Sequence, residues 1–295
     1  MVSKPLVSVH VLAFNHANFI KESLESILNQ ITDFEYDILV CDDASTDNTS
    51  EVVYDLINNH KQGDKIKYFK HSLNIGMVNN AIFVTEKTSS KYIAICEADD
   101  YWIDNNKLQS QIDFLETNLD CSMCFHPVKC LDFINPEKSF IKSPNLTSFD
   151  AKSFFSVKDI IRLGGGAIAT NSMVFKSDCI SNFKEWIKIA KVGDLPLMLL
   201  LTLRGNIGFL NKVMSVYRVS NPNSWTGNYL NSLNKKLGAN NSLLKFWIEF
   251  NSYTKYRYCV YVTYPILRIC ISNLVTMYLL AISKIRINTD SHKKS

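Results

Sequence analysis

Short apolar runs and longer stretches of helical periodicity alternate over the first hundred residues. Apolar side chains three and four positions apart between residues 18 and 31 predict an amphipathic helix with Asn18 as its N-cap. The runs between helices are rich in valine, isoleucine and aromatic residues and end at polar residues, which predicts buried strands. These strands are Leu6–Ala13, Tyr36–Cys41, Lys65–Phe69 and Tyr92–Cys96. Their alternation with helices predicts a parallel sheet covered by helices on both faces.

The pattern is less regular after residue 120. Ser122–Val128 and Ala169–Phe175 have the composition of strands, and Asp194 opens an apolar helix over Leu197–Leu203. The glycine run Gly164–Gly166 lacks the strand and lysine context of a phosphate-binding P-loop, so it predicts a tight turn instead. The sequence contains no internal repeat and no low-complexity tract.

Composition and charge narrow the class of protein. Of the 295 residues, 46% are hydrophobic and 20% are charged, as in folded proteins. The net charge of +4 comes without a block of basic residues in the first two thirds, which argues against a nucleic-acid partner. Eight scattered cysteines and an apolar N-terminal run interrupted by His10 predict reduced thiols in the cytoplasm. Cys121 and Cys124 would point to opposite faces of a strand, so we interpret them as ordinary thiols, not zinc ligands.

Two acidic clusters follow predicted strands, one over residues 42–47 and one over residues 97–100. Because ligands of open α/β sheets bind beyond the carboxyl ends of the strands, both clusters are expected on the same rim. The pair Asp42 and Asp43 has the position of acidic residues that contact a base or ribose. Asp47 or Thr46 is expected to satisfy the free N–H groups of the helix that follows, which is the structural interpretation of the same cluster.

The second cluster, Glu97-Ala98-Asp99 with Asp100, brings two or three carboxylates to one point of the rim. Such a set binds a hard divalent cation, which in turn holds a diphosphate. The alternative is a solvated acidic turn, since aspartate is common in turns.

The motifs taken together resemble glycosyltransferase family 2 over residues 5–230. They occur in the order of that family with sensible spacing. The motifs are Val7-Ser8-Val9 to Asn15, Glu22-Ser23-Leu24-x-Ser26-Ile27-Leu28-x-Gln30, Asp42-Asp43-x-Ser45-x-Asp47-x-Thr49, Asn74-x-Gly76, Glu97-Ala98-Asp99-Asp100-Tyr101-Trp102, Lys107-Leu108-Gln109, Gly193-Asp194-x-Pro196-Leu197, Tyr217-Arg218 and Trp225-x-Gly227.

The resemblance implies a Rossmann-like α/β domain of the glycosyltransferase A type, with a nucleotide-sugar half over 1–120 and an acceptor half over 121–230. It implies that Asp43 contacts uracil, that Glu97 lies near the ribose and that Asp99 binds Mg²⁺ or Mn²⁺. Asp194 matches the general base of an inverting transferase. Phe14 and Asn15 complete the expected nucleotide site.

Four further residues are expected to contact the acceptor or the diphosphate: Asp100, Trp102, Arg218 and Trp225. Trp225 suits stacking on a sugar ring and Arg218 suits charge neutralisation. The alternative is a core tryptophan beside a surface arginine. The glycine turn at 164–166 is expected beneath the acceptor.

The sequence departs from the family pattern in three places. Glu97 replaces the first aspartate of the D-x-D motif and lengthens that side chain by one methylene. Ser220 occupies a position where many relatives carry a histidine, which weakens the case for a third protein ligand to the metal. Phe14 replaces the commoner tyrosine.

The C-terminal residues 231–295 combine apolar, basic and aromatic side chains, which predicts a helical segment in the headgroup zone of a membrane. Cys259–Ser283 is long enough to span a bilayer, but Pro265, Arg268 and Asn273 interrupt it. A spanning helix and a soluble packing helix remain alternatives.

These features predict a transferase that moves a hexose or N-acetylhexosamine from a UDP-sugar to a lipid-linked sugar, in O-antigen or capsule synthesis. The protein would lie at the cytoplasmic face of a bacterial membrane, with an undecaprenyl diphosphate carrying the acceptor. The alternatives are a protein or teichoic acid acceptor, or a catalytically silent scaffold that binds sugar nucleotides.

Overall fold

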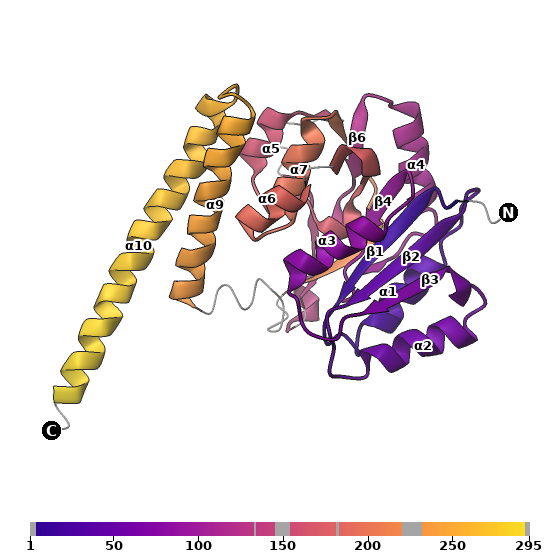
Figure 1. The fold of residues 1–295 in the computed structure, drawn as a ribbon, viewed down its shortest axis with the longest axis horizontal. Coiled ribbons are helices and arrows are strands. Elements are labelled where there is room, and N and C mark those ends of the chain that lie inside the picture. The colour runs from indigo at the N-terminus through magenta and orange to yellow at the C-terminus, as the bar shows by residue number, and fades with distance from the viewer. Residues whose placement is uncertain (1–3, 133, 145–153, 181–182, 220–231, 293–295) are drawn as a thin grey trace. The chain divides into compact units, whose positions relative to one another are not determined.

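The computed structural model describes residues 4–132, 134–144, 154–180, 183–219 and 232–292 (Figure 1). The chain divides into two compact units. The first, here called the α/β unit, comprises residues 1–187 and 192–219, and the second, the helical unit, comprises residues 188–191 and 220–295.

The α/β unit is built on an eight-stranded sheet of order β3-β2-β1-β4-β10-β6-β11-β9. Strands β1, β2, β3 and β4 are parallel, β10 is antiparallel to both its neighbours, and β11 is parallel to β6. The strands are β1 (Val7–Ala13), β2 (Tyr36–Asp42), β3 (Ile66–Lys70), β4 (Tyr92–Ile95), β6 (Cys121–Phe125), β9 (Phe154–Phe155), β10 (Val174–Lys176) and β11 (Asn206–Phe209).

A second sheet of four short strands has the order β5-β12-β7-β8. Its strands are β5 (Tyr101–Trp102), β7 (Val128–Asp132), β8 (Phe140–Lys142) and β12 (Ser215–Val219). The helices of the α/β unit are α1 (Ile20–Leu28), α2 (Thr49–Asn59), α3 (Met77–Lys87), α4 (Lys107–Thr117), α5 (Val157–Leu163), α6 (Phe183–Ala190) and α7 (Asp194–Thr202), with short 3₁₀ turns η1 (Gly63–Lys65), η2 (Pro136–Lys138), η3 (Thr170–Ser172) and η4 (Ser177–Ile180).

The alternation of side chains along β1 and β2 gives each sheet face its own core. Val9, Val11 and Ile38 belong to the large cluster shared with α1, α2 and α4, whereas Leu39 lies in a smaller cluster with Val84 of α3. Figure 1 shows α3 on the opposite side of the sheet from α1 and α2. The prediction of parallel strands with helices on both faces is therefore confirmed for β1 to β4, but the whole sheet is mixed, because β10 and β9 are antiparallel to their neighbours.

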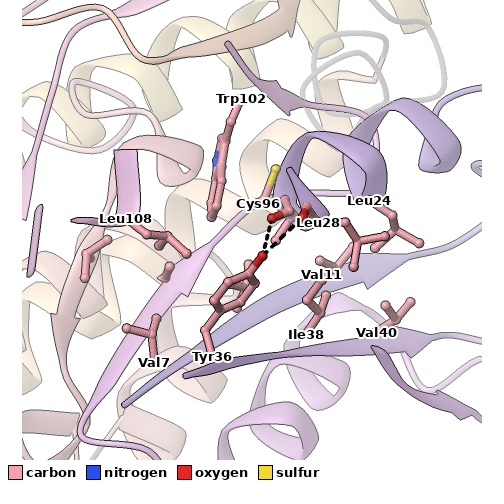
Figure 2. Packing of buried hydrophobic residues seen from close by; sticks show 14 of the residues in the cluster. Val7, Val11, Leu24, Leu28, Tyr36, Ile38, Val40, Cys96, Trp102 and Leu108 are labelled. Atoms are coloured by element: carbon pink, nitrogen blue, oxygen red, sulfur yellow. Dashed lines mark hydrogen bonds between the residues drawn. The ribbon is translucent and has the colours of Figure 1, made fainter. Parts of the chain in front are cut away.

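The large core also contains a hydrogen bond that fixes α1. In Figure 2, the ring of Tyr36 on β2 lies among the aliphatic side chains, and its hydroxyl donates to the carbonyl of Ile27 at 2.9 Å. Burial of the ring with its hydroxyl paired joins the end of α1 to the sheet without leaving an unsatisfied polar group. The loops after β1 and β2 are thereby held on a fixed base.

Three sequence predictions are corrected by the structure. Helix α1 begins after Phe19 and has no side-chain cap, so Asn18 is not its N-cap. The predicted strand Ser122–Val128 is two strands, β6 and β7, which belong to different sheets. The predicted strand Ala169–Phe175 begins instead as the 3₁₀ turn η3, because the polar run Thr170-Asn171-Ser172 bonds to other elements rather than to a ladder.

The helical unit contains α9 (Leu233–Tyr253) and α10 (Cys259–His292), which lie side by side in Figure 1. Phe246, Trp247 and Phe250 of α9 are buried and stack on one another, and Tyr258 packs against Phe250. Lys255 and Tyr256 have left-handed backbone angles and form the turn between the helices.

Polar side chains join α9 to α10. The amide of Asn240 donates to Ser272 at 3.0 Å and to Asn273 at 2.9 Å, and Asn273 donates to Asn241 at 2.9 Å. The other faces of α10 are apolar and exposed, with Val260 at 78% and Leu274 at 68% of full exposure. Among the described residues, Cys259–Ile282 is the one segment long and apolar enough to cross a membrane.

Candidate active site

The loops that follow β1 and β2 are locked together by hydrogen bonds. Asn15 has a left-handed backbone with φ of 56°, its N–H donates to Ser45 Oγ at 2.8 Å, and its side-chain oxygen accepts from the Thr46 N–H at 2.8 Å. Asp47 accepts from the N–H groups of Ala17 and Thr49. Asp47 thus satisfies the free N–H of Thr49, the first residue of α2, but the N-cap position itself is Asn48, whose side chain makes no capping hydrogen bond. Phe14, beside this junction, is 45% exposed.

Asp42 and Asp43, at the end of β2, bind different partners. Asp42 is fully buried and accepts from the Ser45 N–H at 2.7 Å and from the Tyr68 hydroxyl at 2.6 Å. The carboxylate of Asp43 accepts from the backbone N–H groups of Ile75 and Gly76 at 2.7 and 2.8 Å. Asp42 is therefore structural, and Asp43 fixes the turn before α3 at the rim where a nucleotide base is expected.

The second acidic cluster lies beyond β4. One carboxylate oxygen of Glu97 accepts from the Thr170 hydroxyl, and Oε2 is buried without a hydrogen-bond partner among the described residues. Asp100 is fully buried, and its Oδ1 accepts from the Arg218 N–H at 2.9 Å while Oδ2 has no partner in the same part of the chain. Asp99, between them, is half-buried. Two buried carboxylate oxygens thus lack the partner that such atoms ordinarily have.

Burial and neighbouring negative charge raise the pKa values of Glu97 and Asp100. Burial, together with the negative charges of Asp99 and Asp194, raises the pKa of Glu97 to about 7, although the Thr170 hydroxyl opposes the shift. Burial and the charges of Asp99 and Glu97 raise the pKa of Asp100, and Arg218 opposes that shift. An acidic cluster of this kind favours a bound cation.

Arg218 of β12 holds the loop of the second cluster from one side. Its guanidinium donates to the Asp99 carbonyl and to the Glu22 carboxylate, and it lies over the ring of Tyr101 at 4.6 Å. The side chain is 10% exposed. Arg218 therefore lies at the predicted site, and each terminal nitrogen of its guanidinium already donates to a protein group in this structure.

Trp102 lies in the core beneath this loop. It is 4% exposed, its indole N–H donates to the Asn171 carbonyl at 3.2 Å, and the Lys107 ammonium lies 4.0 Å from the ring centre. Burial lowers the pKa of Lys107 to about 7. Little of the Trp102 surface is open to a ligand, so its predicted contact with the acceptor has no support from this arrangement.

Asp194 begins α7 and meets the predicted glycine turn. The Gly166 N–H donates to its carboxylate, and a Cβ added to Gly165 would lie 3.5 Å from the same group. Gly164 and Gly166 have φ of 74°, which glycine adopts without strain. The turn predicted from the glycine run therefore holds the carboxylate that the family motif marks as the base.

Sequence reasoning missed Thr170 and the connection between Gly166 and Asp194. The only signal for Thr170 was a polar run, Thr170-Asn171-Ser172, inside an otherwise apolar segment. Two positions considered from the sequence, Trp225 and Ser220, lie outside the described residues.

A divalent cation fits this site through Asp99 rather than through a complete protein cage. The described residues contain no group of three or more acidic, histidine or cysteine side chains arranged to hold a metal. Mg²⁺ and Mn²⁺ sites that bind phosphate commonly use one or two carboxylates, with the substrate and water as the other ligands. The unpartnered oxygens of Glu97 and Asp100 match that chemistry.

The fold and the rim of carboxylates define a glycosyltransferase A-type domain, the α/β fold of nucleotide-sugar transferases. Residues 8–173 match the family described as Glycosyl transferase family 2. The chain belongs to that family.

Relatives with this sequence pattern occur in several bacteria. The chain is 26% identical over 229 residues to an uncharacterized protein of Mycobacterium tuberculosis, covering 76% of this chain and 61% of the relative. It is 35% identical over 112 residues to the Escherichia coli protein named UDP-Glc:alpha-D-GlcNAc-diphosphoundecaprenol beta-1,3-glucosyltransferase WfaP, covering 38% of this chain and 42% of that one. The chain thus spans less than two thirds of the length of these relatives.

Solved structures share the fold at low sequence identity. S. aureus TarS 1–349 in complex with UDP-GlcNAc has a TM-score of 0.63 at 15% identity, covering 84% of this chain and 67% of that chain. The mannosyltransferase PcManGT from Pyrobaculum calidifontis, in complex with GDP-Man and Mn²⁺, has a TM-score of 0.58 at 14% identity, covering 96% and 81%.

Proposed function

We propose that this protein is an inverting, metal-dependent glycosyltransferase that moves a hexose or N-acetylhexosamine from a UDP-sugar to a lipid-linked sugar. The observation that carries the proposal is the convergence of carboxylates from two parts of the fold. Thr170 donates to Glu97, which follows β4, and Gly166 of the same segment donates to Asp194 at the start of α7, so one segment joins the two carboxylates. Donor-side and acceptor-side groups of a transfer reaction need this proximity.

The donor would lie along the rim from Asp43 to Asp99. Asp43 is fixed where a base would lie, with Phe14 and Asn15 beside it on the adjacent loop, and Glu97 is directed by Thr170. Asp99 would hold Mg²⁺ or Mn²⁺, with Asp100 behind it. When bound, the cation neutralises charge that develops on the leaving diphosphate.

The reaction requires one base and no protein nucleophile. Asp194 would accept the proton of the acceptor hydroxyl as its oxygen bonds to the anomeric carbon and the bond to UDP breaks on the opposite face. A single displacement of this kind inverts the anomeric centre. The hydrogen bond from Gly166 orients the carboxylate before the acceptor arrives. A glycosidase would instead need a protonated carboxyl group paired with a second carboxylate.

A lipid-linked acceptor and a membrane location are supported by the helical unit and by one relative. The printed name of WfaP specifies a diphosphoundecaprenol acceptor. Apolar side chains cover the outer faces of α10, and Lys255, Tyr256 and Arg257 stand at its N-terminal end. Basic and aromatic residues beside an apolar helix favour the headgroup zone of an anionic membrane. We therefore place the protein at the cytoplasmic membrane surface, acting in O-antigen or capsule synthesis.

The test is a panel of UDP-, GDP- and dTDP-sugars incubated with the full chain, with and without Mn²⁺. Each donor is combined with a synthetic undecaprenyl-diphosphate sugar, and nucleotide release and product linkage are measured. We expect release that requires both Mn²⁺ and acceptor, with inverted configuration. The GDP arm matters because PcManGT was solved with GDP-Man. Absence of release and of nucleotide binding across the panel would reject the proposal in favour of a silent scaffold.

A further inference from the structure

Glu97 differs from the aspartate of the family motif by one methylene, and the structure contains a group that compensates for this extra length. A longer side chain has one more rotatable bond, so its carboxylate can adopt more conformations. Here one oxygen of Glu97 accepts from the Thr170 hydroxyl, and the other is buried without a partner among the described residues. The hydrogen bond therefore selects one orientation of the carboxylate.

Thr170 is itself rigidly placed. It opens η3, and three bonds from other elements hold that turn. The Asn171 carbonyl accepts from the Trp102 indole at 3.2 Å, and the Asn171 amide donates to the Val216 carbonyl at 2.8 Å. The Ser172 carbonyl accepts from Gln111 at 2.9 Å. Because η3 is held in place, the Thr170 hydroxyl has a fixed position and can orient the more flexible Glu97 side chain.

The residues that hold η3 are themselves buried and paired. Gln111 is fully buried and accepts from the Lys107 ammonium at 2.7 Å, and Asn171 is also fully buried, with its side-chain oxygen accepting from Ser215 at 3.2 Å. Helix α4, strand β5 and strand β12 thus all contribute to the position of one hydroxyl. Buried networks with every member paired are rigid, which suits a positioning element.

From this geometry we infer that Thr170 is a positioning residue, matched to the glutamate at position 97, which turns the Glu97 carboxylate toward the bound donor. Thr170 acts through Glu97 and does not itself touch the substrate. The inference rests on the proposed function and adds a residue to it. It predicts that the pair Glu97 and Thr170 behaves as one unit when either member is changed.

The test measures binding of UDP, GDP and dTDP, each with Mn²⁺, by calorimetry on the full chain. Thr170→Val keeps the shape of the side chain and removes the hydroxyl. We expect about a tenfold loss of affinity for the nucleotide that the wild type binds, as for removal of a hydrogen bond to a charged group. Thr170→Ser keeps the hydroxyl and should restore affinity to within about twofold. In turnover, KM for the donor should rise while kcat changes little.

A double-mutant cycle completes the test. Glu97→Asp should weaken binding in the wild type, because the shorter arm no longer reaches Thr170, but should add little in the Thr170→Val background. Wild-type affinity in Thr170→Val, or fully additive effects, would overturn the inference while leaving the proposed function intact. A wild type that binds none of the three nucleotides would instead reject the proposed function, and the inference with it.

Discussion

The two units of the molecule differ in which side chains they bury. In the α/β unit, Val7, Val9 and Val11 of β1 are completely buried, and the polar groups of the rim are grouped at the strand ends. In the helical unit the apolar core is confined to the end where α9 meets the start of α10, including Val262, and farther along α10 the polar Thr276 is fully buried while Leu274 is 68% exposed. Amide groups join α9 to α10, and apolar groups face outward.

This difference is what the proposed membrane association of the helical unit requires. Water drives apolar side chains inward, so a helix that keeps its leucines outside gains nothing from that force in water. In lipid, apolar exteriors cost nothing and interhelical hydrogen bonds between amides are retained. The comparison therefore supports the proposal that the α/β unit carries the chemistry and the helical unit the attachment, and each part of the proposal can be tested separately.

The largest effect, on kcat, is expected from Asp194→Asn, which tests whether the catalytic base is this residue of the α/β unit. The amide keeps the shape of the side chain but cannot accept the acceptor proton, so kcat should fall by about a thousandfold. Nucleotide affinity, measured by calorimetry, should change by less than about threefold, because the base does not contact the donor's nucleotide. Asp113→Asn on the exposed face of α4 is the matched control and should be silent. Full turnover in Asp194→Asn would show that another group is the base.

The next largest effect concerns attachment. Replacing three exposed apolar residues of α10 by lysine should lower affinity for phosphatidylglycerol vesicles by at least about a hundredfold, since each loses roughly 2 kcal/mol of buried apolar contact. Turnover of a water-soluble acceptor should not change. These residues are Leu267, Ile271 and Leu274.

The control applies the same chemistry to equally exposed apolar residues of the α/β unit. Lysine at these positions should leave vesicle flotation as in the wild type. The control positions are Ile31, Leu119 and Ile134, which are 62%, 73% and 65% exposed. If both triple variants lost vesicle binding to the same extent, the helical unit would not be the attachment site.

Much of the α/β unit was predictable because its physical signals are local. The strands β1, β2 and β4 are buried on both faces, so each is a largely apolar run, whereas the edge strand β3 has exposed lysines at Lys67 and Lys70 and was found from its aromatic and β-branched residues. Strand order was not needed to predict that residues 42–47 and 97–100 share a rim, since parallel strands end at the same edge. The acidic motifs around Asp43 and Asp99 do follow β2 and β4, as predicted, and their roles stay predictions.

What the sequence did not reveal depends on contacts between distant segments. Thr170 lies 73 residues from Glu97, and Gly166 lies 28 residues from Asp194. Nothing in the local pattern distinguishes η3 from the start of a strand, because what fixes it is distant: its backbone carbonyls accept from α4 and β5, and the Asn171 side chain bonds to β12. The engagement of Arg218 by Glu22 is likewise invisible in the Tyr-Arg motif.

A smaller effect is expected when the pH is lowered, because two buried histidines should make the free energy of unfolding depend on pH. Measuring that dependence tests whether their rings are shielded from water in the folded α/β unit. Burial lowers the pKa of His10 and of His126 to about 3. The unfolded chain binds these protons near pH 6.5 and the folded chain does not. The contribution of each histidine to the free energy of unfolding is therefore fully present above that pH and is lost progressively as the pH falls toward 3. For each histidine the loss between pH 7 and pH 5 is about 2 kcal/mol as an upper bound.

Urea unfolding of the wild type and of His10→Asn and His126→Gln at pH 7 and pH 5 would measure this contribution. Each variant should be less sensitive to the change in pH than the wild type, whatever its stability at pH 7. His60→Gln is a control at a less buried position and should retain the wild-type dependence. Equal pH dependence in all four proteins would mean that neither buried histidine is excluded from protons in the folded state.

The smallest effect should come from the amides between α9 and α10, and it sharpens the contrast between the units. Asn240→Leu leaves Asn273 without one partner, so local opening should become easier by about 1 kcal/mol. Hydrogen exchange of α10 amides should then accelerate by about fivefold. Adding Asn273→Leu should recover part of the protection, because two apolar side chains can pack where two amides were paired. Asn234→Leu, on an exposed position of α9, should change nothing. Faster exchange in the double variant than in Asn240→Leu alone would show that the two amides contribute separately. It would contradict the view that they stabilise the helix pair by bonding to each other.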